Sequence, residues 1–306
     1  MIDAVRGFAY FSTRITPSKI VKVNLATFTR VGAITLDTGK GMIVSAVMDD
    51  VRGFAYFGTD TTPGWVVKVN LATFTVAGAI KLNPGENDLE SAVIDPVRGF
   101  AYFGTFTPTG RVVKINLATF TRVGVITTTT GDNYLQSAVI DIVRGFAYFG
   151  TGQLTNPPGR IVKINLATFT VAGALSLKST ELYLSSAVID PVRGFAYFGT
   201  GQMVAKVVKI NLATFTRVGE IAPSSSGYYM FFSGVIDIER GFAYFGTNTV
   251  PGNVVRVNLA TFNIDKTLGL NTNENDIYSA AIDPVRGFAY FGLGTFPGIV
   301  VKVSLP

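Results

Sequence analysis

The chain has 306 residues, of which 48% are apolar and only 15% are charged, and its formal net charge is +6. It contains no cysteine and no histidine, which excludes disulfide bonds, thiol nucleophiles, cysteine zinc sites and every triad or metal cluster built on histidine. No apolar run approaches the roughly 18 residues of a membrane-spanning helix.

One stretch recurs seven times along the chain, nearly letter for letter. A full copy at 92–105 reads Ala-Val-Ile-Asp-Pro-Val-Arg-Gly-Phe-Ala-Tyr-Phe-Gly-Thr, and the repeats start near residues 1, 46, 92, 138, 187, 234 and 280. A fixed period of this length indicates a repeat architecture. Because nothing interrupts the period, we expect a single domain over residues 1–306.

Each period contains four short apolar runs, which in the third repeat lie at 91–95, 99–105, 111–117 and 122–127. Four strands in about 46 residues are typical of a propeller blade. A strand–helix solenoid would need a helical period, and none is found. The sequence therefore predicts an all-β propeller of four-stranded antiparallel blades.

The first two runs of each repeat predict strands that are buried on both faces. The first run is small and apolar, as expected near a crowded central axis. The second run places aromatic residues on both faces, where they would fill the core between blades. The repeated Asp, Arg and Gly between these runs are interpreted as turn chemistry, with Asp capping the turn, Arg pairing locally and Gly taking a positive φ.

The third run alternates apolar residues with a lysine, Lys114 in the third repeat, which we expect to face solvent. The fourth run is the expected outer edge of the blade. Arg30, Arg122 and Arg217 are interpreted as charges that discourage pairing between edges.

The number of runs predicts seven blades, the last of which has three strands. The second and third runs occur seven times, the fourth occurs six times, and residues 1–3 form only the tail of a first strand. Six blades is the alternative, but it would displace a hairpin of perfect repeat sequence. The last blade would keep an open outer edge, through which the protein could form a homo-oligomer.

The quoted repeat, followed by Val-Val-Lys-Ile-Asn-Leu-Ala-Thr-Phe-Thr, resembles the repeat of the YVTN-type β-propellers of prokaryotic surface proteins. The resemblance covers the whole chain, although Tyr-Phe-Gly-Thr stands where that family usually has Tyr-Val-Thr-Asn. It implies an interaction role at a cell surface or outside the cell and transfers no catalytic residue. The chain begins directly in the repeat, so no signal peptide is expected within it.

The positive charge of the chain is distributed around the repeats. The seven repeated Arg and seven repeated Asp cancel, and a third repeated basic position supplies the excess. Nucleic-acid binding needs a clustered basic surface, so we expect no nucleic-acid partner.

Two connections vary among the repeats: the one between the second and third strands, and the one that leads to the next blade. In an up-and-down blade both emerge on the same side, and loops on a rigid scaffold commonly carry function. We call this side the variable-loop face. Its candidate ligand-binding residues are Glu86, Asp88, Glu90, Asp132, Tyr134, Tyr183, Tyr228, Tyr229, Glu274, Asp276 and Tyr278.

Three functions are compatible with this pattern. The first is a non-enzymatic binding scaffold for a protein or glycan partner. The second is a propeller hydrolase or lyase acting on a sugar or lactone, and the third is a structural repeat protein without a ligand. The acids do not form an EF-hand loop and no singular acid lies in the repeated framework. We therefore expect no catalytic residue, no resident metal and no cofactor.

Overall fold

The computed structural model describes residues 1–153, 158–202, 204–223 and 230–306. Within these ranges the chain forms seven antiparallel sheets, and its fold class is the all-β, seven-bladed β-propeller. Six sheets have four strands and the last has three, so the seven-blade prediction is confirmed and the six-blade alternative is wrong. Across the same ranges the single helical element is a 3₁₀ turn, η1 (Thr38–Lys40).

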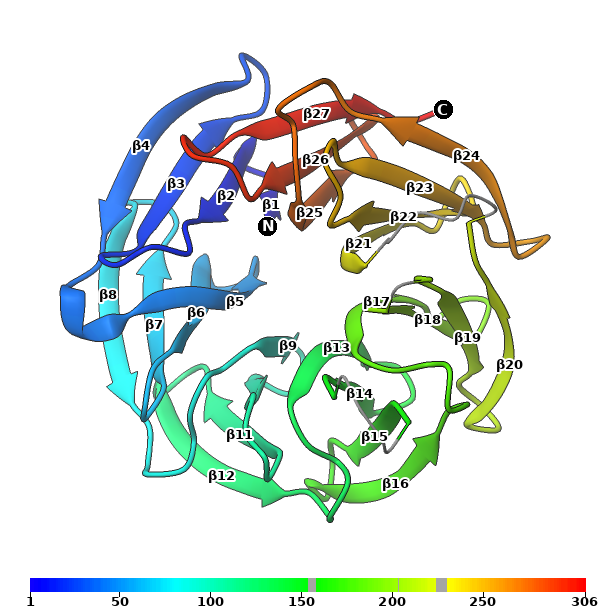
Figure 1. The fold of residues 1–306 in the computed structure, drawn as a ribbon. Coiled ribbons are helices and arrows are strands. Elements are labelled where there is room, and N and C mark those ends of the chain that lie inside the picture. Colours follow the sequence, from blue (N-terminus) through cyan, green and yellow to red (C-terminus); the bar gives the residue numbers. More distant parts are fainter. Residues whose placement is uncertain (154–157, 203, 224–229) are drawn as a thin grey trace. The chain divides into compact units, whose positions relative to one another are not determined.

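Within each blade the strands lie side by side in chain order (Figure 1). The first strands are β1 (Ile2–Asp3), β5 (Met42–Asp49), β9 (Ser91–Asp95), β13 (Leu135–Asp141), β17 (Leu184–Asp190), β21 (Phe231–Asp237) and β25 (Ile277–Asp283). The second strands are β2 (Phe8–Ser12), β6 (Phe54–Asp60), β10 (Phe100–Gly104), β14 (Phe146–Thr151), β18 (Phe195–Thr200), β22 (Phe242–Thr247) and β26 (Phe288–Leu293).

The outer strands complete the blades. The third strands are β3 (Lys19–Asn24), β7 (Trp65–Asn70), β11 (Arg111–Asn116), β15 (Arg160–Asn165), β19 (Val207–Asn211), β23 (Asn253–Asn258) and β27 (Val300–Ser304). The fourth strands are β4 (Thr29–Thr35), β8 (Thr75–Lys81), β12 (Thr121–Thr127), β16 (Thr170–Ser176), β20 (Thr216–Ile221) and β24 (Asn263–Gly269).

The chain divides into two compact units. Unit 1 comprises Met1–Phe149 and Val162–Ala174, and unit 2 comprises Gly150–Ile161 and Leu175–Pro306. Strands β1 to β13 therefore belong to unit 1 and β17 to β27 to unit 2. The expectation of a single domain over residues 1–306 stays a prediction.

The turn between the first and second strands is built by the repeated Asp and Arg. In the third blade the buried Asp95 accepts hydrogen bonds from the Arg98 backbone N at 3.0 Å and from Arg98 Nη1 at 2.7 Å, while Gly99 takes a φ of 77°. The predicted turn chemistry is confirmed. In addition, Arg98 Nη1 donates to the Ile142 carbonyl of the next blade at 3.3 Å, so this arginine also joins neighbouring blades.

Aromatic residues and a serine fill the space between adjacent blades. Tyr56 of the second blade and Phe103 of the third belong to one buried cluster, as predicted for the second strands. On the first strand, Ser91 Oγ donates to the Leu135 carbonyl of the next blade at 2.7 Å. A Cβ at Gly104 would overlap Ser91 Oγ and lie 2.9 Å from Leu135 Cβ. Glycine at this position is therefore needed for the close approach of the next blade.

The repeated lysine is not the solvated side chain that the alternation predicts. Lys114 Nζ lies 3.9 Å from the ring centroid of Phe100 and 5.0 Å from that of Phe169 in the next blade. Burial lowers the pKa of Lys114. Because an aromatic face attracts a cation, the lysine stabilises the packing between blades. The same contact with the ring of the second strand occurs at Lys22, Lys68, Lys163, Lys209 and Lys302.

The described ranges contain no helix that is both long enough and apolar enough to span a membrane.

Candidate functional site: the variable-loop face

The two variable connections of a blade lie against each other, as predicted. In the second blade the Asp88 backbone N donates to the Thr61 carbonyl at 3.2 Å, and the Leu89 backbone N donates to the Thr59 carbonyl at 3.0 Å. In the third blade the Tyr134 backbone N donates to the Thr107 carbonyl at 2.9 Å, in the same way as Asp88 to Thr61. The loop leading to the next blade therefore rests on the loop between the second and third strands.

Four of the predicted site residues occupy equivalent positions in the loops of different blades and have the same backbone conformation. They all have a positive φ, between 50° and 54°, and they are Asp88, Tyr134, Tyr183 and Asp276. The carbonyls of Asp88, Tyr183 and Asp276 each accept a hydrogen bond from the next blade at 2.7 Å, and the donors are the backbone N atoms of Phe106, Gly201 and Gly294. A left-handed conformation is costly for residues other than glycine. These hydrogen bonds hold it in place and present the side chain at the loop surface.

A second set of acids is buried and supports the loops themselves. Glu86 is 1% exposed, and its Oε2 accepts a hydrogen bond from the Asn83 backbone N at 3.0 Å. Asp132 is fully buried and accepts a hydrogen bond from Thr129 Oγ1 at 2.6 Å. Both residues were predicted as ligand-binding residues, and their ligand-binding role stays a prediction. Their contacts are those of residues that cap the loop.

Glu181 is a third member of this set, which the sequence interpretation missed. It is fully buried, and its Oε2 accepts a hydrogen bond from the Lys178 backbone N at 3.0 Å. The sequence contains a pattern that could have identified Glu181: an acid lies three residues before the buried Leu or Ile at or just before the start of the first strand. The acids at this spacing are Glu86, Asp132, Glu181 and Glu274.

Two of these buried acids bind an arginine of the next fourth strand. Arg122 Nε lies 3.0 and 2.9 Å from the two carboxylate oxygens of Glu86, and this hydrogen bonding raises the pKa of Arg122. Arg217 Nε lies 2.9 and 3.0 Å from those of Glu181. Arg122 and Arg217 were interpreted as charges that discourage edge pairing, but each forms an ion pair with a buried carboxylate.

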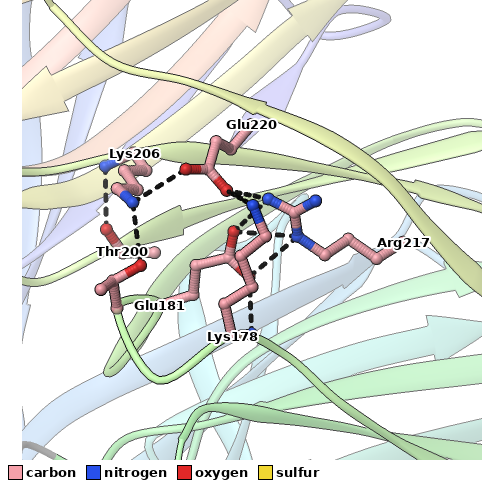
Figure 2. A network of polar contacts seen from close by, with 7 residues as sticks. Lys178, Glu181, Thr200, Lys206, Arg217 and Glu220 are labelled. Carbon is pink, nitrogen blue, oxygen red and sulfur yellow. Dashed lines mark hydrogen bonds and ion pairs between the residues drawn. The ribbon is translucent and has the colours of Figure 1, made fainter.

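Figure 2 shows that the pair in unit 2 extends into a network. Glu220 of β20 contacts Arg217, accepts a hydrogen bond from Lys178 Nζ at 3.1 Å and another from Lys206 Nζ at 2.9 Å. Two carboxylates and three cations thus meet where the loop before β17 reaches the edge of β20. This network links parts of unit 2 and leaves Glu181 inaccessible to a ligand.

Unit 1 gathers three carboxyl groups and an arginine on its variable-loop face. Burial, followed by a side-chain hydrogen bond with Asp60, raises the pKa of Asp88 to about 6. Burial also raises the pKa of Glu90, although Arg14 Nη2 lies 3.7 Å from Glu90 Oε1 and Gln136 Nε2 donates to the same oxygen at 3.2 Å. The structure brings the predicted residues Asp88 and Glu90 together and adds Asp60, Arg14 and Gln136.

The predicted Tyr134 packs on Phe106, whose backbone N donates to the Asp88 carbonyl. Its ring centroid is 4.9 Å from that of Phe106, with an angle of 50° between the planes. In the part of the chain that the structure describes, no group of three or more acids is arranged to hold a metal ion.

Unit 2 carries a row of aromatic side chains. The ring centroids of Tyr183 and Phe232 are 6.2 Å apart, and those of Phe232 and Tyr278 are 5.3 Å apart. Tyr278 is 39% exposed, and its Oη accepts a hydrogen bond from Asn248 Nδ2 at 3.1 Å. A Cβ at Gly294 would overlap the Tyr278 ring, so glycine makes room for it. Two predicted residues, Tyr228 and Tyr229, lie outside the described residues.

Phe232 is not among the candidate residues chosen from the sequence, although the repeat alignment could have identified it. Phe232 and Tyr278 occupy equivalent positions near the start of β21 and β25, where the strand pairing shifts by one residue. Such bulges redirect a side chain from the regular alternation. Predicting a loop at Tyr278 was therefore wrong, since it lies within β25.

The last two predicted residues belong to the loop before β25. Glu274 is partly exposed, and its Oε2 accepts a hydrogen bond from the Asn271 backbone N at 2.7 Å. Asp276 is also partly exposed and holds the positive φ described above.

No family model matches the chain, and no curated protein matches it in sequence. Solved structures match in fold. Hydrazine synthase of Kuenenia stuttgartiensis superposes with a TM-score of 0.79 at 12% identity, over 94% of this chain and 89% of that one. The structure of U3-55K superposes with a TM-score of 0.76 at 8% identity, over 96% and 87%. At these identities the likeness concerns the propeller fold.

Proposed function

We propose that the chain is a non-enzymatic binding scaffold that takes a glycan on its variable-loop face. The observation that carries the proposal is the row formed by Tyr183, Phe232 and Tyr278 in unit 2. Aromatic side chains offer a broad apolar face and, for tyrosine, a polar tip. The apolar faces of sugar rings stack on such surfaces, and the Asn248 amide, which holds the Tyr278 hydroxyl, provides hydrogen-bonding groups beside them.

The resemblance of the repeat to YVTN-type propellers supports the same function. That family implies a surface or extracellular protein with interaction roles, where glycans and peptides are available partners. A peptide is the other partner considered for this face, because exposed tyrosine is also a common anchor in protein interfaces.

A glycan array probed with the labelled protein tests the proposal. We expect binding that falls at least tenfold in Tyr278→Ala and in Phe232→Ala. The matched control is Val285→Ala, in the same blade, because Val285 is 86% exposed in the turn before β26. Binding that survives both aromatic substitutions, or that is lost in Val285→Ala, would contradict the assignment. A peptide array run in parallel distinguishes a peptide partner.

One observation favours a hydrolase or lyase as the second candidate. Asp88, with a pKa near 6 beside Asp60, has the proton affinity of a general acid working near neutral pH. A panel of aryl glycosides and lactones, assayed with and without Ca²⁺, tests this function. Turnover that disappears in Asp88→Asn and Asp60→Asn would replace the scaffold proposal. No binding and no turnover would favour a structural protein without a ligand.

A further inference from the structure

The last blade has an open edge with apolar residues partly exposed. Strand β27 pairs with β26 only, because its sheet ends there. Val300, Val301 and Val303 are partly exposed. Their counterparts in β7 are all fully buried, and they are Val66, Val67 and Val69. An unpaired edge of this kind can accept a further strand through its backbone N–H and C=O groups.

The loop that leads into the last blade has a carboxylate, Glu274, in the position where other blades bind an arginine of the fourth strand. The loop of Glu274 repeats the loops of Glu86 and Glu181: the Glu backbone N donates to the carbonyl three residues before it, and the Glu carbonyl accepts from a glycine N at 2.8 Å. In those two loops the carboxylate binds Arg122 or Arg217. Among the described residues, Glu274 has no cation and is more exposed than Glu86 or Glu181.

The strand register places the absent arginine. Arg122 lies opposite Ile115 in the third blade, and Arg217 lies opposite Ile210 in the fifth. Each of these isoleucines lies opposite the alanine of its second strand, as Val303 lies opposite Ala289 in the last blade. An arginine on a strand added to β27 would therefore lie opposite Val303 and reach Glu274.

An aromatic position next to the edge is also unfilled. The phenylalanine before a fourth strand packs on the tyrosine of the preceding blade, as Phe120 does on Tyr56 and Phe262 on Tyr197, both at 5.9 Å. For Tyr244, in the blade before the last, the described part of the chain supplies no such ring. Arg256 replaces the repeated lysine there, and its Nε donates to Asp265 at 2.9 Å.

We propose that β27, Glu274 and Tyr244 together form an acceptor site for an extended segment of a partner chain, with the pattern Phe-Thr-Arg-Val-Gly. The partner strand would pair antiparallel with β27, its arginine would bind Glu274, and its phenylalanine would pack beside Tyr244. Arginine accompanies a glutamate at this loop position. In the second and fourth blades, where the loop has Lys40 or the shorter Asp132 instead, the fourth strand carries valine, Val76 or Val171.

Fluorescence anisotropy with two labelled peptides tests the site. The first peptide copies residues 118–128, Ala-Thr-Phe-Thr-Arg-Val-Gly-Val-Ile-Thr-Thr, and the second replaces its arginine by valine. For the full chain we expect the arginine peptide to bind on the order of tenfold more tightly, as befits one buried charge-assisted hydrogen-bonded pair. In Glu274→Gln the two peptides should bind equally. A third peptide with alanine for phenylalanine should bind several-fold more weakly.

The control variant is Glu239→Gln, which removes an exposed negative charge from the same unit, at the turn before β22, and should keep the preference for arginine. Amide hydrogen exchange should slow at Val300–Ser304 when the arginine peptide binds. If the protein is a dimer and the arginine peptide dissociates it, the site is supported and the partner chain that supplies the strand is a second copy of the protein. The proposal is overturned if neither peptide binds, if both bind the full chain equally, or if Glu274→Gln keeps the preference.

Discussion

At the scale of single residues, the same type of side chain has opposite roles at different depths in one loop. Glu86 is buried, caps its loop and binds Arg122. Asp88, two residues later, is held at the loop surface with a positive φ. The candidate site therefore consists of the residues at the left-handed position and at the following bulge. The acids at the capping position stabilise the loops.

The capping role predicts unequal effects of one substitution in two blades. Glu86→Gln keeps an acceptor for Asn83 but leaves Arg122, whose side chain is 24% exposed, without its carboxylate. Removing one partner of a largely buried pair is costly, so we expect a loss of about 2 kcal/mol in the free energy of unfolding. Glu274→Gln, in the same loop geometry without an arginine, should cost less than about 0.5 kcal/mol. Urea unfolding of both variants measures the difference, and equal losses would contradict the role of Arg122.

The contact between Asp88 and Asp60 predicts a pH effect. Burial and this contact raise the pKa of Asp88 to about 6 in the folded protein, whereas an unfolded Asp titrates near 3.9. Between these values the folded state holds a proton that the unfolded chain has lost, so this group's contribution to stability falls as the pH rises through 6. Asp88→Asn should therefore stabilise the protein at pH 7.5 and not at pH 4.5, by less than about 1 kcal/mol after solvent screening.

Asp276→Asn is the matched control for this pH effect. Asp276 has the same backbone conformation, but Asn248 stands where Asp88 has Asp60. Urea midpoints of both variants at the two pH values measure the effect. Besides burial, the negative charge of Asp88 also contributes to the raised pKa of Glu90, so the effect of Asp88→Asn includes this coupling. An equal change in the two variants would mean that the carboxyl pair does not matter.

At the scale of elements, several parts of a blade also contact the next blade. The first strand contributes the serine hydroxyl bond, and the turn contributes the arginine that reaches a neighbouring carbonyl. The third strand contributes the lysine between two phenylalanine rings. These contacts explain why small and charged residues recur within strands that are otherwise apolar. Each is fitted to the close approach of another blade.

The lysine contact predicts which substitutions a third strand tolerates. Lys114→Met keeps the aliphatic length but removes the charge above Phe100, and should cost about 0.5–1 kcal/mol. Lys114→Glu places an anion against the negative face of the ring in a partly desolvated position, and should cost more, about 2 kcal/mol. Lys19→Glu, at an exposed position at the start of β3, is the control. Chemical unfolding measures the free energy of unfolding of the three variants. If Lys114→Glu leaves this free energy unchanged, the lysine is solvated as the sequence predicts.

At the scale of the whole molecule, the repeats form a chain of similar packing units. Buried clusters combine residues of consecutive blades, such as Tyr56 with Phe103 in unit 1 and Tyr197 with Phe245 in unit 2. In such an architecture stability is approximately a sum over blades and their neighbours. A blade that lacks one strand is expected to be the least protected member.

Amide hydrogen exchange should reveal this difference directly. We expect Val300–Ser304 of β27 to exchange at least tenfold faster than Trp65–Asn70 of β7 under native conditions. The reason is that β27 lacks a fourth strand, so that its outward backbone groups are open to solvent. Mass spectrometry of peptides from the third strands measures the rates. Comparable protection of the two strands would mean that the edge is already covered.

The sequence alone determined the fold class, the seven blades, the three-stranded last blade and the chemistry of the Asp–Arg–Gly turn. These features depend on local periodicity and on turn residues such as Asp95 and Gly99, whose roles are set within a few positions along the chain. The face that carries the variable loops also followed from this pattern, because strand alternation decides where connections emerge.

Only the tertiary structure decided what each side chain in that pattern contacts. Lys114 alternates as a solvated residue would, yet it lies between rings of two blades, and Glu86 looks like a free loop acid, yet it binds an arginine 36 residues away. These partners are distant in sequence and are brought together by the packing of neighbouring blades. Burial and charge pairing depend on that packing, and a single repeat read by itself contains neither.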